Sequence, residues 1–148
     1  MVIPKLILIP VTALIVAQAI KFIITAIKGE WRWSVLQEYG GMPSAHTAFV
    51  VSLTTVIWRQ EGWLSPSFAL AAVFSLIIIR DAIGFRQFLC EHGRTLNLLV
   101  KELPNQADRK FSPRMVEQLG HTPIQATIGG LLGFILGWWL YSIITATW

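Results

Sequence analysis

Two short segments of the sequence place a histidine beside the expected start of a helix. In Gly40–Thr47, a glycine pair and a proline precede Ser44, and His46 follows two residues later. In Gly120–Gln125, His121 is followed by a Thr-Pro pair. Serine and threonine are typical N-cap residues, and proline favours the first helical position. Each histidine is therefore predicted to lie at the N-terminus of a helix.

A helix N-terminus with an adjacent histidine is suited to binding an anion. The unpaired N–H groups of the first turn and the helix dipole both attract negative charge. An imidazole can act near pH 7 as a nucleophile when neutral or as an acid when protonated. If the two helix starts face the same side, His46 and His121 can share one phosphate. Four basic residues are candidates to hold its oxygens: Lys21, Lys28, Arg86 and Arg114.

Each of these residues also has a simpler interpretation. Ser44 can be a plain helix cap, the histidines polar residues at the membrane surface, and Lys21 a helix-end lysine that extends to the interface. Asp81 follows an apolar stretch and can form an ion pair with Arg80 or Arg86. A histidine can also bind a porphyrin or chlorophyll, but no other feature specifies such a pigment. We expect no metal and no cofactor.

The composition places these helix starts in an integral membrane protein. Of 148 residues, 54% are hydrophobic and 14% are charged, whereas soluble domains carry about 25% charged residues. The apolar residues form long blocks, and helices satisfy their own backbone groups in lipid. We predict an all-α membrane bundle of about four transmembrane helices, as a single domain over residues 1–148. The expected spans are about 7–27, 44–58, 67–89 and 123–147, with a polar loop at 101–120.

Charge and glycine patterns predict the orientation and the packing. Most basic residues between the spans lie in the first and third connections, on the side of the two helix starts, and the positive-inside rule places that side in the cytoplasm. The net charge of +4 fits loops that face an anionic membrane surface. We expect membrane lipids as partners and no nucleic acid. Gly129, Gly133 and Gly137 have the spacing of closely packed membrane helices.

Three segments in order carry a resemblance to a known family. Pro43–His46 looks like a motif of the superfamily of type 2 phosphatidic acid phosphatases and vanadium haloperoxidases. The longer strings Gly40–Ala48, Arg80–Arg86 and Leu119–Pro123 resemble the divergent PAP2 branch of that superfamily. The resemblance extends roughly over Gln18–Gly137 and implies a small protein embedded in the membrane.

The resemblance also implies roles for individual residues. His121 matches the histidine that attacks phosphorus and forms a phosphohistidine, and His46 matches the acid that protonates the leaving alcohol. Ser44 would hold a phosphoryl oxygen. Lys21 or Lys28 would match the lysine of the first motif.

The sequence departs from the superfamily pattern in each motif that supplies charge. No Arg-Pro pair follows Lys21, and Met115 occupies the place of an arginine, with Arg114 one residue away. Gln125 stands where an aspartate normally orients the nucleophilic histidine. Gln125 can still accept a hydrogen bond, and Asp81 is a candidate to supply the missing carboxylate.

The resemblance implies an enzyme that hydrolyses a lipid phosphate or a prenyl diphosphate at the cytoplasmic face, without a metal. The departures keep a second class open, namely a non-catalytic family member. Such a protein would bind an anionic lipid, or serve as a small subunit or assembly factor of a larger membrane complex. The enzyme and the non-catalytic protein are both compatible with a homo-oligomer. A transporter or channel has less support, because only the first span carries charge that would mark an ion path.

Overall fold

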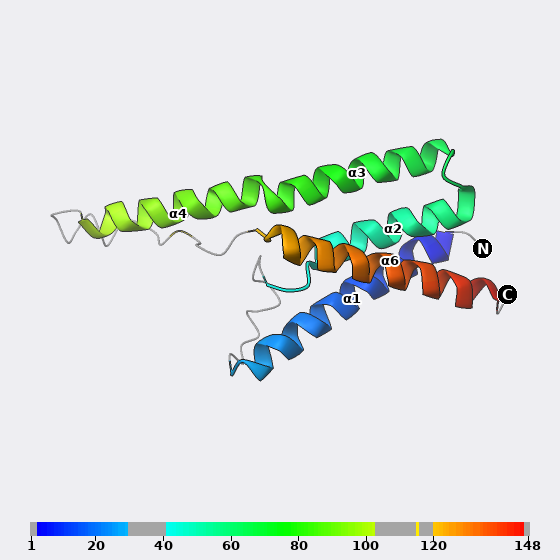
Figure 1. Cartoon of the computed structure of the whole chain (residues 1–148), viewed down its shortest axis with the longest axis horizontal. Helices are drawn as coiled ribbons and strands as arrows, with labels where there is room; N and C mark the ends of the chain where they lie inside the picture. The colour runs from blue at the N-terminus through cyan, green and yellow to red at the C-terminus, as the bar shows by residue number, and fades with distance from the viewer. Residues whose placement is uncertain (1–2, 30–40, 103–114, 116–119, 147–148) are drawn as a thin grey trace.

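The computed structural model describes residues 3–29, 41–102, 115 and 120–146. Every regular element in these residues is an α-helix, as Figure 1 shows. The helices are α1 (Ile3–Ile27), α2 (Ala45–Glu61), α3 (Pro66–Ile83), α4 (Phe85–Glu102) and α6 (Pro123–Ala146). The prediction of an all-α protein is therefore confirmed.

Three helical stretches are long and apolar enough to cross a membrane: Lys5–Ile27, Pro66–Glu102 and Pro123–Ala146. Helix α2 has 17 residues and is the centre of the bundle, where it contacts α1, α3 and α6. Its neighbours separate it from lipid on several sides, so it tolerates more polar residues than a helix that faces lipid all round. The segments predicted as spans are helical, in α1, α2, the α3–α4 stretch and α6, and the prediction that α2 crosses the membrane stays a prediction.

The contact between α2 and α6 is closest where small residues face one another. Three glycines of α6 lie against three small residues of α2 with the same four-residue spacing: Gly129, Gly133 and Gly137 against Ser44, Ala48 and Ser52. A Cβ atom at Gly133 would collide with the backbone carbonyl oxygen of Ala48. Only glycine lets the two backbones approach this closely. The packing expected from the glycine spacing is confirmed.

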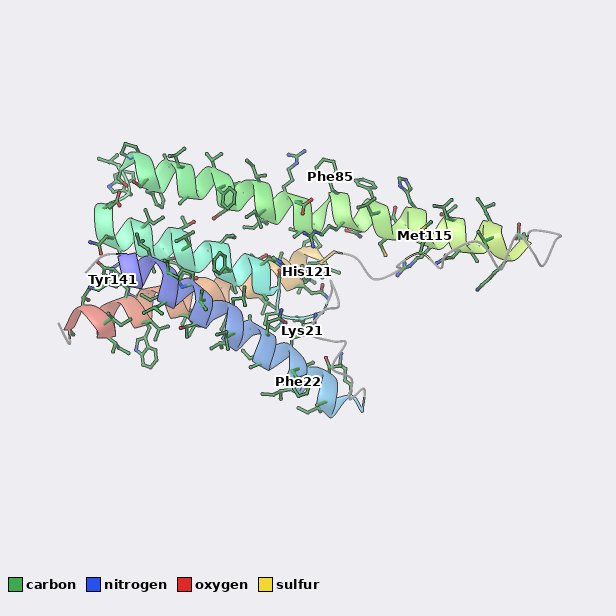
Figure 2. The ribbon with its side chains drawn as sticks, turned by 180° about the vertical axis from the view of Figure 1, so that it is seen from behind. Lys21, Phe22, Phe85, Met115, His121 and Tyr141 are labelled. Atoms are coloured by element: carbon green, nitrogen blue, oxygen red, sulfur yellow. The ribbon has the colours of Figure 1, made fainter. Side chains whose placement is uncertain are left out.

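Helix α1 packs against α2 and α6 through one stripe of its surface. Ile9, Ala13, Ala17 and Lys21 are buried and recur every four residues, which places them on the same face. The stripe ends at Lys21, which is only 7% exposed. Figure 2 shows Lys21 near His121, while Tyr141 lies at the opposite end of the bundle.

That opposite end is closed by aromatic and cationic side chains. The Tyr141 hydroxyl donates a hydrogen bond to Gln60 Oε1 at 3.1 Å, which joins α6 to α2. The Arg59 guanidinium lies 4.1 Å from the centre of the Trp138 ring, within the range of a cation–π contact. These contacts fix the ends of α2 and α6 farthest from the two histidines.

Helices α3 and α4 form one long helical stretch, and Gly84 is the junction between them. The Gly84 N–H donates to the Arg80 carbonyl at 2.8 Å, and α4 begins at the next residue. Figure 1 shows α4 continuing roughly in line with α3, past the ends of the other helices. The span predicted at about 67–89 thus belongs to a helical stretch that continues to Glu102. Residues 103–114 and 116–119 of the predicted polar loop lie outside the described residues.

Gly133 and Gly130 provide a matched test of the α2–α6 contact. In Gly133→Ala the new methyl group meets the Ala48 backbone, and we expect a loss of about 1–3 kcal/mol of stability from overpacking. In Gly130→Ala the nearest atom is 3.6 Å from the new methyl group, so the substitution causes no overpacking. Alanine is favoured over glycine in a helix, and we expect this variant to gain up to about 1 kcal/mol of stability. Thermal unfolding in detergent measures both. Equal melting temperatures for the two variants would contradict this packing.

Candidate functional site

The site is organised by the N-terminal turns of α2 and α6, which meet at one end of the bundle. The Ser44 N–H donates a hydrogen bond to the Gln125 carbonyl at 3.2 Å, so the chain entering α2 is tied directly to the first turn of α6. The two helix starts thus lie together at one end of the bundle, as their predicted placement on one side of the membrane requires. Their positive dipole ends therefore point toward one region.

The start of α2 is capped by Ser44, as predicted. Ser44 Oγ accepts from the Thr47 N–H at 3.4 Å and from the Thr47 hydroxyl at 3.0 Å. The residue is fully enclosed, with 0% of its surface exposed, and its backbone lies against Gly129. A direct bond from this hydroxyl to a phosphate would require the cap to rearrange. The phosphate-holding role of Ser44 stays a prediction.

The start of α6 is a reciprocal capping box. The Gln125 N–H donates to Thr122 Oγ1 at 3.3 Å, and the Thr122 N–H donates to Gln125 Oε1 at 3.0 Å. The side-chain oxygen of Gln125 thus serves the helix cap. Its predicted role in orienting His121 is not decided by this arrangement.

His121 is held by its backbone against the junction of α3 and α4. The His121 N–H donates to the Ala82 carbonyl at 2.9 Å. The preceding Gly120 has a φ of +96°, and a Cβ there would lie 3.0 Å from the Gln87 nitrogen. Glycine fits both the backbone conformation and the space. The segment Arg80–Arg86 therefore provides the surface on which His121 docks.

The His121 imidazole is half-buried between the helix starts. Its Nδ1 atom is buried and has no hydrogen-bond partner among the described residues. Burial lowers the pKa of His121, and the positive charges of His46 and Lys21 lower it further, while Gln125 and the Gly41 backbone act in the opposite direction. The lowered pKa favours the neutral imidazole, which is the form that acts as a nucleophile or hydrogen-bond acceptor.

Lys21 is the lysine that the fold brings to the histidines. Gly41, with a φ of +90°, crosses its side chain, and a Cβ at that position would lie 3.0 Å from Lys21 Cε. Lys21 interacts electrostatically with both His46 and His121. Lys28 is exposed, seven residues further along the chain. Of the two candidate lysines, the structure places Lys21 in the site.

Asp81 and Arg86 form an ion pair at the edge of the site, with 2.9 Å between Arg86 Nε and Asp81 Oδ2. This pairing was one of the alternatives for Asp81. Both residues interact electrostatically with His46, which is exposed in the first turn of α2. Asp81 was a candidate to supply a carboxylate to His121, whereas its charge acts on His46. The structure thus brings Asp81 toward the other histidine.

Arg114 lies outside the described residues, so its predicted phosphate contact is untested. The neighbouring Met115 is anchored to α4 by a contact that the sequence analysis missed. The Asn97 amide donates to the Met115 carbonyl at 2.9 Å and accepts from its N–H at 2.9 Å. Gly41 and Gly120 were also missed as residues that shape the site. Their positions just before the two helix starts were the available signal.

The fold and the site together define an all-α membrane protein with histidines and a buried lysine at the meeting point of two helix N-termini. The profile of the Divergent PAP2 family matches residues 3–136, and the chain belongs to this family. It is 36% identical over 135 residues to the Uncharacterized membrane protein YuiD of Bacillus subtilis (strain 168). That match covers 84% of this chain and 85% of YuiD. No solved structure matches the chain.

The surroundings of His121 predict its titration. We expect its midpoint below the ordinary histidine value of 6.5, because burial disfavours the imidazolium. Acid should also favour unfolding. As the pH falls, the unfolded chain binds this proton at a higher pH than the folded protein does. The free energy of unfolding therefore decreases as the pH falls through the lower pKa of the folded protein. NMR of histidine-labelled protein in detergent, assigned with His121→Gln, measures the midpoint. A value at or above 6.5 would contradict the burial of the ring.

Proposed function

We propose that this protein is a membrane phosphatase that hydrolyses a lipid phosphate or a prenyl diphosphate through a phosphohistidine on His121. The observation that carries the proposal is the convergence of His46, His121 and Lys21 at two helix N-termini joined by a direct hydrogen bond. Helix dipoles, a lysine and imidazole groups together fit a phosphate. On the basis of the positive-inside rule, this end of the bundle is proposed to face the cytoplasm.

The proposed reaction has two steps. A bound phosphate is negatively charged and would favour the protonated form of His46 beside it. The neutral imidazole of His121 attacks phosphorus, the bond from phosphorus to the leaving oxygen breaks, and this protonated His46 gives its proton to that oxygen. Water then attacks the phosphohistidine, and His46 takes a proton from it, which releases phosphate and restores His121. Proton transfer by a positioned histidine typically contributes about 10²–10⁴-fold to the rate.

The basic residues are proposed to balance the charge of the phosphoryl group. Lys21 is held beside both histidines under Gly41. Of the charged groups around His46, Arg86 interacts with it most strongly, and the bond to Asp81 fixes the direction of its guanidinium. Lys21 and Arg86 would thus approach the phosphate from α1 and from the α3–α4 junction.

A second candidate function is a non-catalytic anionic-lipid binder, or a small subunit or assembly factor of a larger membrane complex. Two observations favour it. Gln125 uses its side-chain oxygen in the α6 cap, and the carboxylate of Asp81 is bonded to Arg86. A carboxylate that orients a catalytic histidine also stabilises its positively charged form. The same basic residues at two helix N-termini could bind a lipid phosphate without such a carboxylate.

Phosphate release from a panel of lipid phosphates and prenyl diphosphates, measured with purified protein in detergent, tests the enzymatic proposal. We expect His121→Ala to abolish release and His46→Ala to lower it by about 10²–10⁴-fold. His92→Ala is the matched control, because His92 is exposed on α4 and should keep the parent rate. If folded parent protein releases no phosphate from any substrate, the non-catalytic function is favoured.

Gln125→Glu restores a carboxylate and retains the shape needed for the capping box. The added negative charge should raise the pKa of His121 relative to the parent. If His121 is the nucleophile, phosphate release should rise several-fold, because the carboxylate stabilises the positive charge that develops on the ring. NMR titration and phosphate release measure the two effects. A higher pKa with unchanged release would argue against His121 as the nucleophile.

A further inference from the structure

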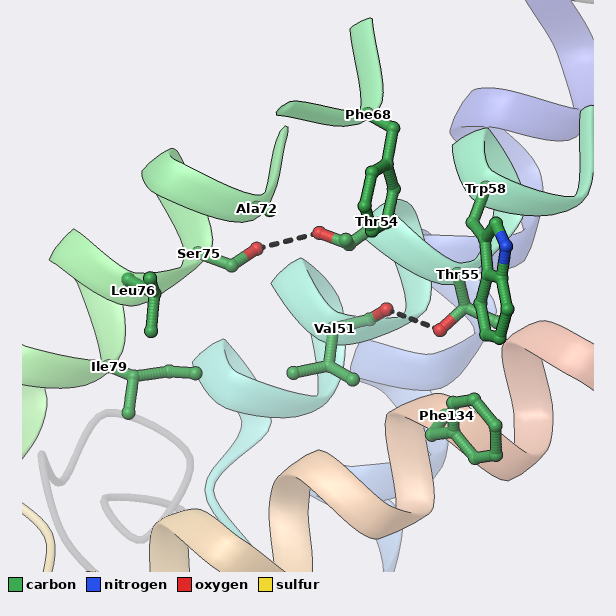
Figure 3. Close-up of a pocket in the computed structure, with 10 residues that line it drawn as sticks. All are labelled: Val51, Thr54, Thr55, Trp58, Phe68, Ala72, Ser75, Leu76, Ile79 and Phe134. Carbon is green, nitrogen blue, oxygen red and sulfur yellow. Dashed lines mark hydrogen bonds between the residues drawn. The ribbon is translucent and has the colours of Figure 1, made fainter. Parts of the chain in front are cut away.

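A groove of about 380 Å³ lies on the outer side of α2, between α3 and α6 (Figure 3). We call it the chain groove, and define it by Val51 and Trp58 of α2, Phe68, Ala72 and Ile79 of α3, and Phe134 of α6. Its volume falls within the range of small-molecule sites, about 300–1,000 Å³. The groove is separate from the histidine site, and its lining is apolar.

The hydroxyl groups along the groove are already engaged in hydrogen bonds. Thr54 Oγ1 lies 2.8 Å from Ser75 Oγ, and Ser75 Oγ donates to the Val50 carbonyl at 3.1 Å. Thr55 Oγ1 donates to the Val51 carbonyl at 2.8 Å. Figure 3 shows that the Thr54–Ser75 and Thr55–Val51 hydrogen bonds join lining residues to one another. A polar ligand would lose hydrogen bonds to water here without replacement, so the groove selects a hydrocarbon.

The far end of the groove is formed by aromatic rings. The centre of the Trp58 ring lies 6.4 Å from that of Phe68 and 6.5 Å from that of Phe134. Both α3 and α6 belong to stretches apolar enough to cross a membrane. An occupant therefore reaches the groove from the hydrocarbon of the bilayer, and the rings limit how far it extends.

The near end of the groove lies close to the proposed phosphate site. Val51 is five residues after His46 on α2, and Ile79 is two residues before Asp81 on α3. At 1.5 Å per residue these separations are about 7.5 Å and 3 Å along the helix axes. The near end of the groove is therefore within reach of the tail of a lipid whose phosphate lies at the two helix starts.

We propose that the chain groove binds one hydrocarbon chain, acyl or isoprenoid, of the phosphorylated lipid whose head group occupies the histidine site. This inference rests on the proposed function and identifies the residues that select the substrate. The groove fits a single chain because α2, α3 and α6 enclose it on three sides. Ala72 and Ile79 are then residues that determine specificity, although they take no part in the reaction.

Photo-crosslinking with a lipid phosphate that carries a diazirine in its acyl chain tests the groove independently of catalysis. We expect adducts in the α2 and α3 peptides that contain Val51 and Ile79, in the parent and in His121→Ala alike. Unlabelled long-chain lipid phosphate should compete. Adducts spread evenly over the lipid-facing surfaces, or a groove protected by a second copy or another protein, would overturn the proposal.

Substitutions that fill the groove provide the second measurement. Ala72→Phe, and Leu76→Trp at an exposed position of the lining, should lower crosslinking and raise KM for long-chain substrates at least tenfold. Short-chain phosphates should be hydrolysed as by the parent. Val73→Phe adds similar bulk on the exposed, lipid-facing side of α3 and is the control. Equal loss for all chain lengths would overturn a chain-binding role. Specific crosslinking without any phosphate release would support the groove and reject the phosphatase.

Discussion

The close contact between α2 and α6 is the constraint on which the site depends. Lipid surrounds a membrane helix with a medium as apolar as its own side chains, so helix association relies on close packing rather than on hydrophobic burial. The glycines of α6 bring its backbone against the backbone of Ser44, Ala48 and Ser52. The approach is close enough for the Ser44 N–H to reach the Gln125 carbonyl. Two helix N-termini are therefore held at one level.

The remaining elements bring charge and shape to that meeting point. Helix α1 contributes Lys21 at the end of its buried stripe. The α3–α4 junction receives Gly120 and His121 on its backbone and adds the Asp81–Arg86 ion pair. Burial and the charges of His46 and Lys21 lower the pKa of His121 and so favour its neutral form. The result is a site where two helix N-termini and a lysine lie beside a histidine in its neutral form, an arrangement suited to a phosphate.

The same geometry explains why catalysis and lipid binding are both physically reasonable. The anion-binding features come from backbone N–H groups, helix dipoles and Lys21, and none of these depends on a carboxylate beside His121. A phosphohistidine step makes an additional demand, because the ring gains positive charge as the new bond forms. Asp81 pairs with Arg86, and Gln125 serves the α6 cap and also acts on His121 by a side-chain hydrogen bond. Gln125 therefore supplies a hydrogen bond but no negative charge.

Local signals in the sequence determined the helices and their starts. Long apolar blocks, the caps at Ser44 and Thr122, and the glycine spacing of α6 each depend on residues close in the chain, so pattern alone predicted them. Tertiary structure decided which distant residues meet: Lys21 rather than Lys28, Asp81 with Arg86, and Gly120 against the start of α4. It also enclosed Ser44 and formed the groove between α3 and α6. These features arise from the relative placement of helices, which close backbone packing sets and which no short stretch of sequence encodes.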